Sequence, residues 1–116
     1  MELLEMTNKL LDEKLAEHIV DIDMRGASIF TDWFVVCTAR NVRHGNALAE
    51  ALEQEASKQG FNVRLREGEK ESTWILVDME EVIVHIFTEE ARSMFRLEKL
   101  WADLPQEAYP SEGTAL

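Results

Sequence analysis

The stretch DWFVVCTARNVRH, residues 32–44, joins the two local patterns that decide the fold. Residues 33–37, WFVVC, are apolar at every position, which is typical of a central strand covered on both faces. After the turn, small and apolar residues recur at helical spacing and Gly60 follows at the usual helix end: Ala47, Leu48, Ala51, Leu52 and Ala56. The sequence therefore predicts a strand, a turn and a helix from about Val42 to Gln59.

The segment before this unit contains one more helix and one more strand by the same criteria. Five leucines lie near one helical stripe with charged residues between them: Leu3, Leu4, Leu10, Leu11 and Leu15. They predict an amphipathic first helix. Residues 19–24, IVDIDM, alternate apolar and acidic positions, which predicts a strand with one solvated face that ends before Gly26.

The segment after the unit contains three further runs that are rich in β-branched and aromatic residues. They are FNVRLRE at 61–67, STWILVD at 72–78 and EVIVHIF at 81–87. The last two are close enough in sequence to form an antiparallel hairpin. The order of elements predicts the α/β class, with a mixed five-stranded sheet flanked by helices.

A last helix is predicted after the third run. Thr88 suits the N-cap, because Glu89 and Glu90 fall in the first turn where the helix dipole favours acidic residues. We expect this helix to reach about Trp101.

The length of the chain suits one domain. With 116 residues it can bury one hydrophobic core but not two, so we expect a single domain over residues 1–103. Residues 104–116, LPQEAYPSEGTAL, contain both prolines and no apolar periodicity. They predict a mobile C-terminal tail.

The charge of the chain restricts its partners. Asp and Glu outnumber Lys and Arg by 23 to 12, and the net charge of -11 disfavours phosphate backbones and anionic lipid surfaces. We therefore expect no membrane contact and no direct sequence-specific binding of nucleic acid. The same charge favours a basic protein as partner, although it serves solubility equally well.

The N-terminus and the cysteine content favour the cytoplasm. Cys37 is the only cysteine and its neighbours are apolar, which predicts a buried, reduced thiol. Acidic residues throughout the first 15 positions argue against a signal or transit peptide. No segment reaches the length that a membrane span requires.

Two acidic residues are the candidates for catalysis. Asp21 and Asp23 lie two apart on a predicted strand and could hold Mg²⁺ for phosphoryl transfer, as in a nucleotidyltransferase. Such an enzyme also needs a Gly/Ser-rich turn around the triphosphate, and TARNVRH at 38–44 has neither residue. We favour the solvated face of an edge strand, and expect no catalytic residue, no metal and no cofactor.

The histidines give no sign of a metal site. His18, His44 and His85 lack ligand spacing with Cys37, and His85 on an apolar strand is expected to be a hydrogen-bonded structural residue. His44 and Arg43 would lie in the first turn of the central helix, where cations oppose the dipole. They either bind an anion or have no function there, and the sequence leaves both readings open.

Large aromatic residues of one predicted strand and of the predicted last helix form a further signal. Trp74, Phe95 and Trp101, together with Leu97 and Leu100, exceed what one short helix normally buries in a small domain. Exposed tryptophan often anchors a protein interface, whereas the alternative places all of these residues in the core. The residue types alone leave both alternatives open.

Several motifs together resemble one family. In order they are DWFVVCTARNVRH with its Ala/Leu helix, EG, WILVD, VIVHIF and LEKLW, and they resemble the ribosomal silencing factor family, also called Iojap-related proteins. The resemblance covers about residues 3–103 and implies a nucleotidyltransferase-like fold that has lost catalysis. It also implies binding to the fourteenth protein of the large ribosomal subunit, which blocks subunit joining and represses translation when nutrients are scarce.

The resemblance also implies which residues bind the partner. They are Trp74, Phe95, Leu97, Glu98, Lys99 and Trp101. Tyr is more usual at Phe95, Glu98 would meet cations of the ribosomal protein, and Trp101 belongs to either the interface or the core. The family pattern T-G-x-S-x-R-H keeps only its Thr and its Arg-His pair in residues 38–44. A homodimer that covers the apolar patch is a further hypothesis.

Overall fold

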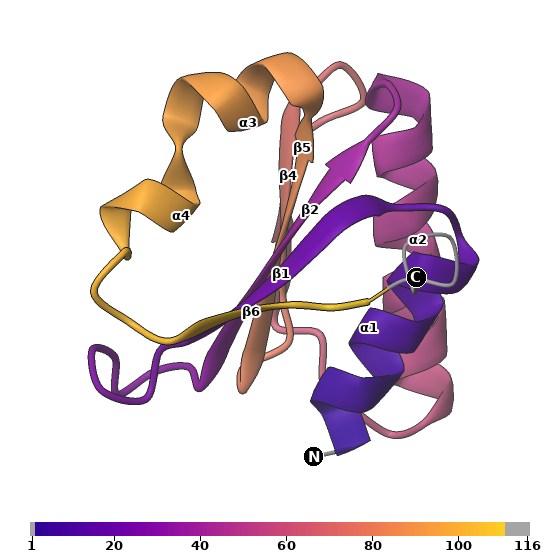
Figure 1. Cartoon of the computed structure of the whole chain (residues 1–116). Coiled ribbons are helices and arrows are strands. Elements are labelled where there is room, and N and C mark those ends of the chain that lie inside the picture. The colour runs from indigo at the N-terminus through magenta and orange to yellow at the C-terminus, as the bar shows by residue number, and fades with distance from the viewer. Residues whose placement is uncertain (1, 111–116) are drawn as a thin grey trace.

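The computed structural model describes residues 2–110 and contains one mixed sheet with helices on both faces (Figure 1). The elements are α1 Glu2–Glu13, β1 Glu17–Asp23, β2 Trp33–Ala39, α2 Val42–Lys58, β3 Leu65–Glu67, β4 Trp74–Asp78, β5 Val82–Thr88, α3 Glu89–Phe95, α4 Leu97–Leu100 and β6 Gln106–Ala108. The strand order is β3-β4-β5-β2-β1-β6. Strands β2 and β5 pair in parallel, and the other neighbours are antiparallel. The predicted α/β class is confirmed.

The sheet separates two hydrophobic clusters. Helices α1 and α2 lie against one face, and α3 and α4 lie against the other (Figure 1). Successive side chains of a strand point to opposite faces, so Val35 packs in the first cluster and Val36 in the second. Both are fully buried, as is Cys37. The prediction that WFVVC forms a central strand covered on both faces is therefore confirmed.

The strand–turn–helix unit also forms as predicted. Asn41 is the N-cap of α2, and its side chain accepts a hydrogen bond from the backbone N–H of His44 at 2.8 Å. The helix ends at Lys58, and Gly60 follows with a φ of +85°, a conformation that glycine adopts without strain. Among residues 2–110, no helix combines the length and apolar character needed to cross a membrane.

The predicted hairpin is confirmed, whereas the predicted last helix is interrupted. Trp74 of β4 pairs with Phe87 of β5 in antiparallel register. Thr88 caps α3 as predicted, but Arg96 adopts a left-handed conformation with a φ of 47° and separates α3 from α4. This break turns Leu97 into the second cluster, where it is buried.

The sheet has six strands rather than the predicted five, because residues 106–108 form β6. This strand pairs with β1, and Tyr109 donates its backbone N–H to the Ile19 carbonyl. Leu104 packs against the second cluster and Tyr109 against the first. The prediction of a tail without secondary structure is wrong for these residues, since a three-residue strand held by backbone bonds leaves no apolar periodicity. Residues 111–116 lie outside the described residues.

Removal of β6 should destabilise the domain. We expect a chain that ends at Asp103 to lose about 2 kcal/mol of unfolding free energy, because Leu104 and Tyr109 are both half-buried. Urea denaturation of the two chains measures the difference. A chain that ends at Pro110 keeps every strand pair described above and is the control. Equal urea midpoints for the Asp103 and Pro110 chains would show that β6 contributes nothing.

Candidate functional site

The turn before α2 is closed by its own side chains. The His44 Nδ1 accepts a hydrogen bond from the Arg40 N–H at 3.0 Å, so its Nε2 carries the proton and donates to the Lys14 carbonyl at 2.8 Å. The side-chain oxygen of Asn41 accepts a hydrogen bond from the backbone N–H of His44. His44 is therefore a structural link between this turn and the α1–β1 connection, whereas Arg43 lines a pocket with Asn46 and Arg66.

The two candidate catalytic carboxylates have different partners. Asp23 accepts hydrogen bonds from Arg25, which lower its pKa to about 2. Burial raises the pKa of the Asp21 carboxyl to about 6, although Asn8 donates to it at 2.7 Å and partly offsets this effect. β1 lies between β2 and β6, so the interpretation as an edge strand is wrong. Within residues 2–110, no group of three or more His, Cys, Asp or Glu residues could hold a metal.

The aromatic residues gather on the sheet face that carries α3 and α4. Ring centroids lie 4.7 Å apart for Trp74 and Phe95, and 4.6 Å apart for Phe34 and His85. We call these residues, with Phe87 and Trp101, the aromatic strip: Phe95, Phe87, Trp74, His85, Phe34 and Trp101. The strip joins Trp74 of β4 to the predicted contact residues of α3 and of the α4 end.

His85 fixes the orientation of Trp74. The indole Nε1–H of Trp74 donates to the Nδ1 of His85 at 3.1 Å, so the second ring nitrogen of His85 carries the proton. Burial lowers the pKa of His85 to about 4, and the ring is neutral at pH 7. The prediction of a hydrogen-bonded structural histidine is confirmed.

The predicted contact residues differ in how much of their surface is available. Phe95 is 49% exposed and Lys99 is exposed, whereas Trp74 and Trp101 are half-buried. Leu97 is 8% exposed and belongs to the second cluster. The aromatic residues therefore include both buried and accessible surface, so neither of the two alternatives describes all of them.

Glu98 has a partner inside the chain. Its two carboxylate oxygens accept hydrogen bonds from the Nε and one terminal nitrogen of Arg92, both at 2.9 Å. Arg92 also donates to the carbonyl of His18 and to the Thr38 hydroxyl. This network links α3 and α4 to β1 and β2. The Glu98 carboxylate, which the family resemblance implied would meet a cation of the partner, is thus bound to Arg92.

The outer part of the same sheet face carries exposed apolar side chains. By strand register, Leu65, Leu76 and Ile83 lie on the face of Trp74 and His85. Leu65 is 41% exposed, and the other two are half-buried. With Trp74 and Phe95 these residues form what we call the open face.

Exposed carboxylates lie at the rim of the open face, where the neighbouring cation, Arg64, is paired with Asp78. Glu67 follows Leu65 on the same side of β3, and Glu80 and Glu81 stand at the adjacent β4–β5 turn; all three are exposed. Sequence reasoning missed Leu65, Leu76 and Ile83, because a half-exposed leucine and a buried one look alike in a strand pattern.

Comparison with known proteins gives a family. The family model described as "Ribosomal silencing factor during starvation" matches residues 1–115. The ribosomal silencing factor of Haemophilus influenzae is 41% identical over 88% of this chain and all of its own length. A mouse protein named "Mitochondrial assembly of ribosomal large subunit protein 1" is 28% identical over 84% of this chain and 44% of its own. A crystal structure from Bacillus halodurans, 34% identical, matches 91% of this chain and 96% of its own with a TM-score of 0.80.

Asp21 and His85 should have opposite effects on stability in one pH range. The folded-state pKa of Asp21, about 6 against an ordinary 3.8, makes the folded chain relatively more stable as pH falls through 6. The folded-state pKa of His85, about 4 against 6.5, makes it less stable as pH falls from 6.5 to 4. The two contributions largely cancel in the wild type.

Asp21→Asn should expose the contribution of His85. We expect the variant to be more stable than the wild type at pH 7.5, by about 1 to 2 kcal/mol after allowance for the partial exposure of Asp21. Its unfolding free energy should then fall by about 3 kcal/mol on acidification to pH 4.5. Urea denaturation at both pH values measures these changes. Stability of the variant that rises on acidification would contradict the assignment.

Proposed function

The chain belongs to the ribosomal silencing factor family, and from this membership we propose that it binds the large ribosomal subunit and represses translation. In this proposal the bound protein covers the surface where the small subunit docks, and so blocks subunit association by steric exclusion in the cytoplasm. The partner is the fourteenth large-subunit protein. The name of the mouse relative, which refers to the large subunit, supports the choice of subunit.

The observation that carries the proposal is the open face with its acidic rim. A sheet face with exposed leucine and aromatic side chains is a usual centre for a protein interface, and acidic residues around it favour a basic partner. The net charge of -11 acts in the same direction at longer range and would speed association.

The residues implied by the family resemblance take different parts in this proposal. Phe95 and Trp74 would be the central contacts, because they are neighbours and at least partly accessible. Lys99 would contact the partner at the edge, since its side chain is exposed. Leu97 and Trp101 would support the surface from beneath.

Glu98 would act by holding α3 and α4 in place, because its carboxylate is bound to Arg92. In a partly buried bidentate pair of this kind, removal of one side chain leaves the other without its hydrogen-bond partner. A direct contact between Glu98 and the ribosomal protein would therefore require that the pair open first.

The alternative function, a nucleotidyltransferase that uses Asp21 and Asp23, has less support. The two carboxylates are bound to Asn8 and Arg25, and the turn before α2 is closed by His44. Calorimetric titration with ATP and Mg²⁺ tests it directly. Tight, metal-dependent binding that is lost in Asp21→Ala would favour the enzyme.

Phe95→Ala should separate binding from folding. Because Phe95 is 49% exposed, its truncation should change stability little. The loss of an interface anchor should weaken large-subunit binding by about 2 kcal/mol, or roughly 30-fold. Co-sedimentation with separated subunits measures binding, and Leu15→Ala, at another exposed apolar position, is the control. Trp74→Ala is less informative, since it also removes the hydrogen bond to His85.

Inhibition should depend on the ratio of this protein to large subunits. A steric mechanism requires about one bound copy for each blocked subunit and consumes no nucleotide. Titration of subunit joining by light scattering measures the ratio. Full inhibition by a small fraction of one copy per subunit would exclude the steric mechanism, and light scattering of the free protein would test the homodimer hypothesis.

A further inference from the structure

The connection between β1 and β2 presents two large apolar side chains to solvent. Ile29 is 93% exposed and Phe30 is 73% exposed. Two adjacent apolar side chains with this exposure are unusual in a turn where the neighbouring Met24 and Thr31 are buried. The motifs that place the chain in its family do not include them.

The connection is held in one conformation by its own hydrogen bonds. The backbone N–H of Met24 donates to the Asp32 carbonyl at 2.8 Å and closes the turn. The Ser28 hydroxyl accepts hydrogen bonds from the N–H groups of Phe30 and Thr31, at 3.1 and 3.3 Å. The two exposed side chains are therefore presented by an ordered turn, and little conformational entropy would be lost if they were bound.

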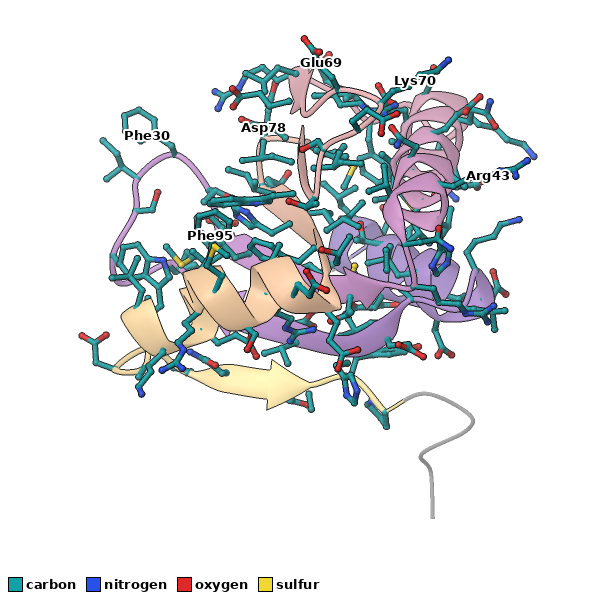
Figure 2. All side chains as sticks on the ribbon, turned by 90° about the horizontal axis from the view of Figure 1, so that it is seen from above. Phe30, Arg43, Glu69, Lys70, Asp78 and Phe95 are labelled. Carbon is teal, nitrogen blue, oxygen red and sulfur yellow. The ribbon has the colours of Figure 1, made fainter. Side chains whose placement is uncertain are left out.

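The turn is also attached to the open face. The Thr31 hydroxyl donates to the Glu81 carbonyl at 3.0 Å, and the N–H of Asp32 donates to the same oxygen at 2.9 Å. Glu81 directly precedes β5, which carries Ile83 of the open face. In Figure 2, Phe30 and Phe95 both lie on the side of the sheet away from α2, and Phe30 projects outward.

The surroundings of the turn have the same charge as the rim of the open face. Asp32 is half-buried beside it, and Glu81 is exposed. The nearby cation, Arg25, lies over the Trp33 ring and is paired with Asp23 at 2.7 Å, so its charge is compensated. A surface that fits both the turn and the open face must therefore be basic around an apolar depression.

We propose that Ile29 and Phe30 form a second anchor that inserts into an apolar pocket of the same basic ribosomal protein that covers the open face. The inference rests on the proposed function and extends its contact surface to a part of the chain outside the family motifs. Because two anchors on one rigid body bind at the same time, the loss of either one should weaken the affinity strongly.

Phe30→Ser and Phe30→Leu test the proposal with the full-length chain and purified large subunits. Both should keep the wild-type urea midpoint, because Phe30 contributes mainly exposed surface. Phe30→Ser should weaken co-sedimentation by more than about tenfold, whereas Phe30→Leu should stay within about threefold of wild type. Leu15→Ser, at a position that is 57% exposed in the α1–β1 connection, should bind as wild type.

The salt dependence of binding identifies the kind of contact. Phe30→Ser should shift the affinity without changing its slope against salt concentration, because an apolar contact releases no counterions. Wild-type affinity for Phe30→Ser, or equal losses for the Ser and Leu variants, would overturn the inference alone. Dissociation of a homodimer by Phe30→Ser with unchanged subunit binding would overturn it in favour of a second copy. Failure of the wild type to bind large subunits would instead overturn the proposed function, and the inference with it.

Discussion

The parallel pairing of β2 with β5 is the interaction on which the rest of the structure depends. Seven residues of each strand are in register, from Trp33 with Val82 to Ala39 with Thr88. Both strands are largely apolar and are buried on both sides, so their pairing requires cover on two faces. The remaining elements meet this requirement unequally, because α2 has 17 residues whereas α3 has seven and α4 has four. The unequal cover leaves the outer strands β3 and β4 accessible on the side of α3.

The position of α3 and α4 is fixed by charge as well as by packing. Arg92 is 12% exposed at its side chain and joins Glu98 of α4 to backbone and hydroxyl oxygens of β1 and β2. The left-handed Arg96 ends α3 and changes the direction of the chain before α4, so that Glu98 can face Arg92. Helix α3 is thereby held on β5 and β2, where its Phe95 reaches Trp74 of β4. Leu65 and Leu76 keep accessible surface beyond it. The accessible face is therefore a consequence of where the short helices are held.

The sequence predicts the centre of this fold better than its margins. WFVVC, the α2 stripe and the β4–β5 hairpin follow from the local sequence pattern, because the apolar positions of each element are the ones that it buries. β6 is too short to show a pattern, and the break at Arg96 lies in a segment whose helical pattern is continuous in the sequence. The family motifs lead to Trp74 and Phe95, and the structure brings these two side chains into contact. Other surface residues, such as Phe30, are recognised as candidate contacts only by their exposure. Exposure cannot be deduced from residue type.

The two faces of the sheet also differ in the surface that they offer to the proposed partner. An α/β unit usually binds phosphate at the helix start after a central strand, where free N–H groups converge. Here the Asn41 side chain accepts a hydrogen bond from one of these N–H groups, that of His44. The His44 ring also bonds to the Lys14 carbonyl. The start of α2 is thus partly occupied by the chain's own side chains, and a pocket beside it is lined by Arg43, Asn46 and Arg66. The surface that the proposed partner would cover is the opposite face, where apolar side chains, an acidic rim and an ordered apolar turn suit a basic protein.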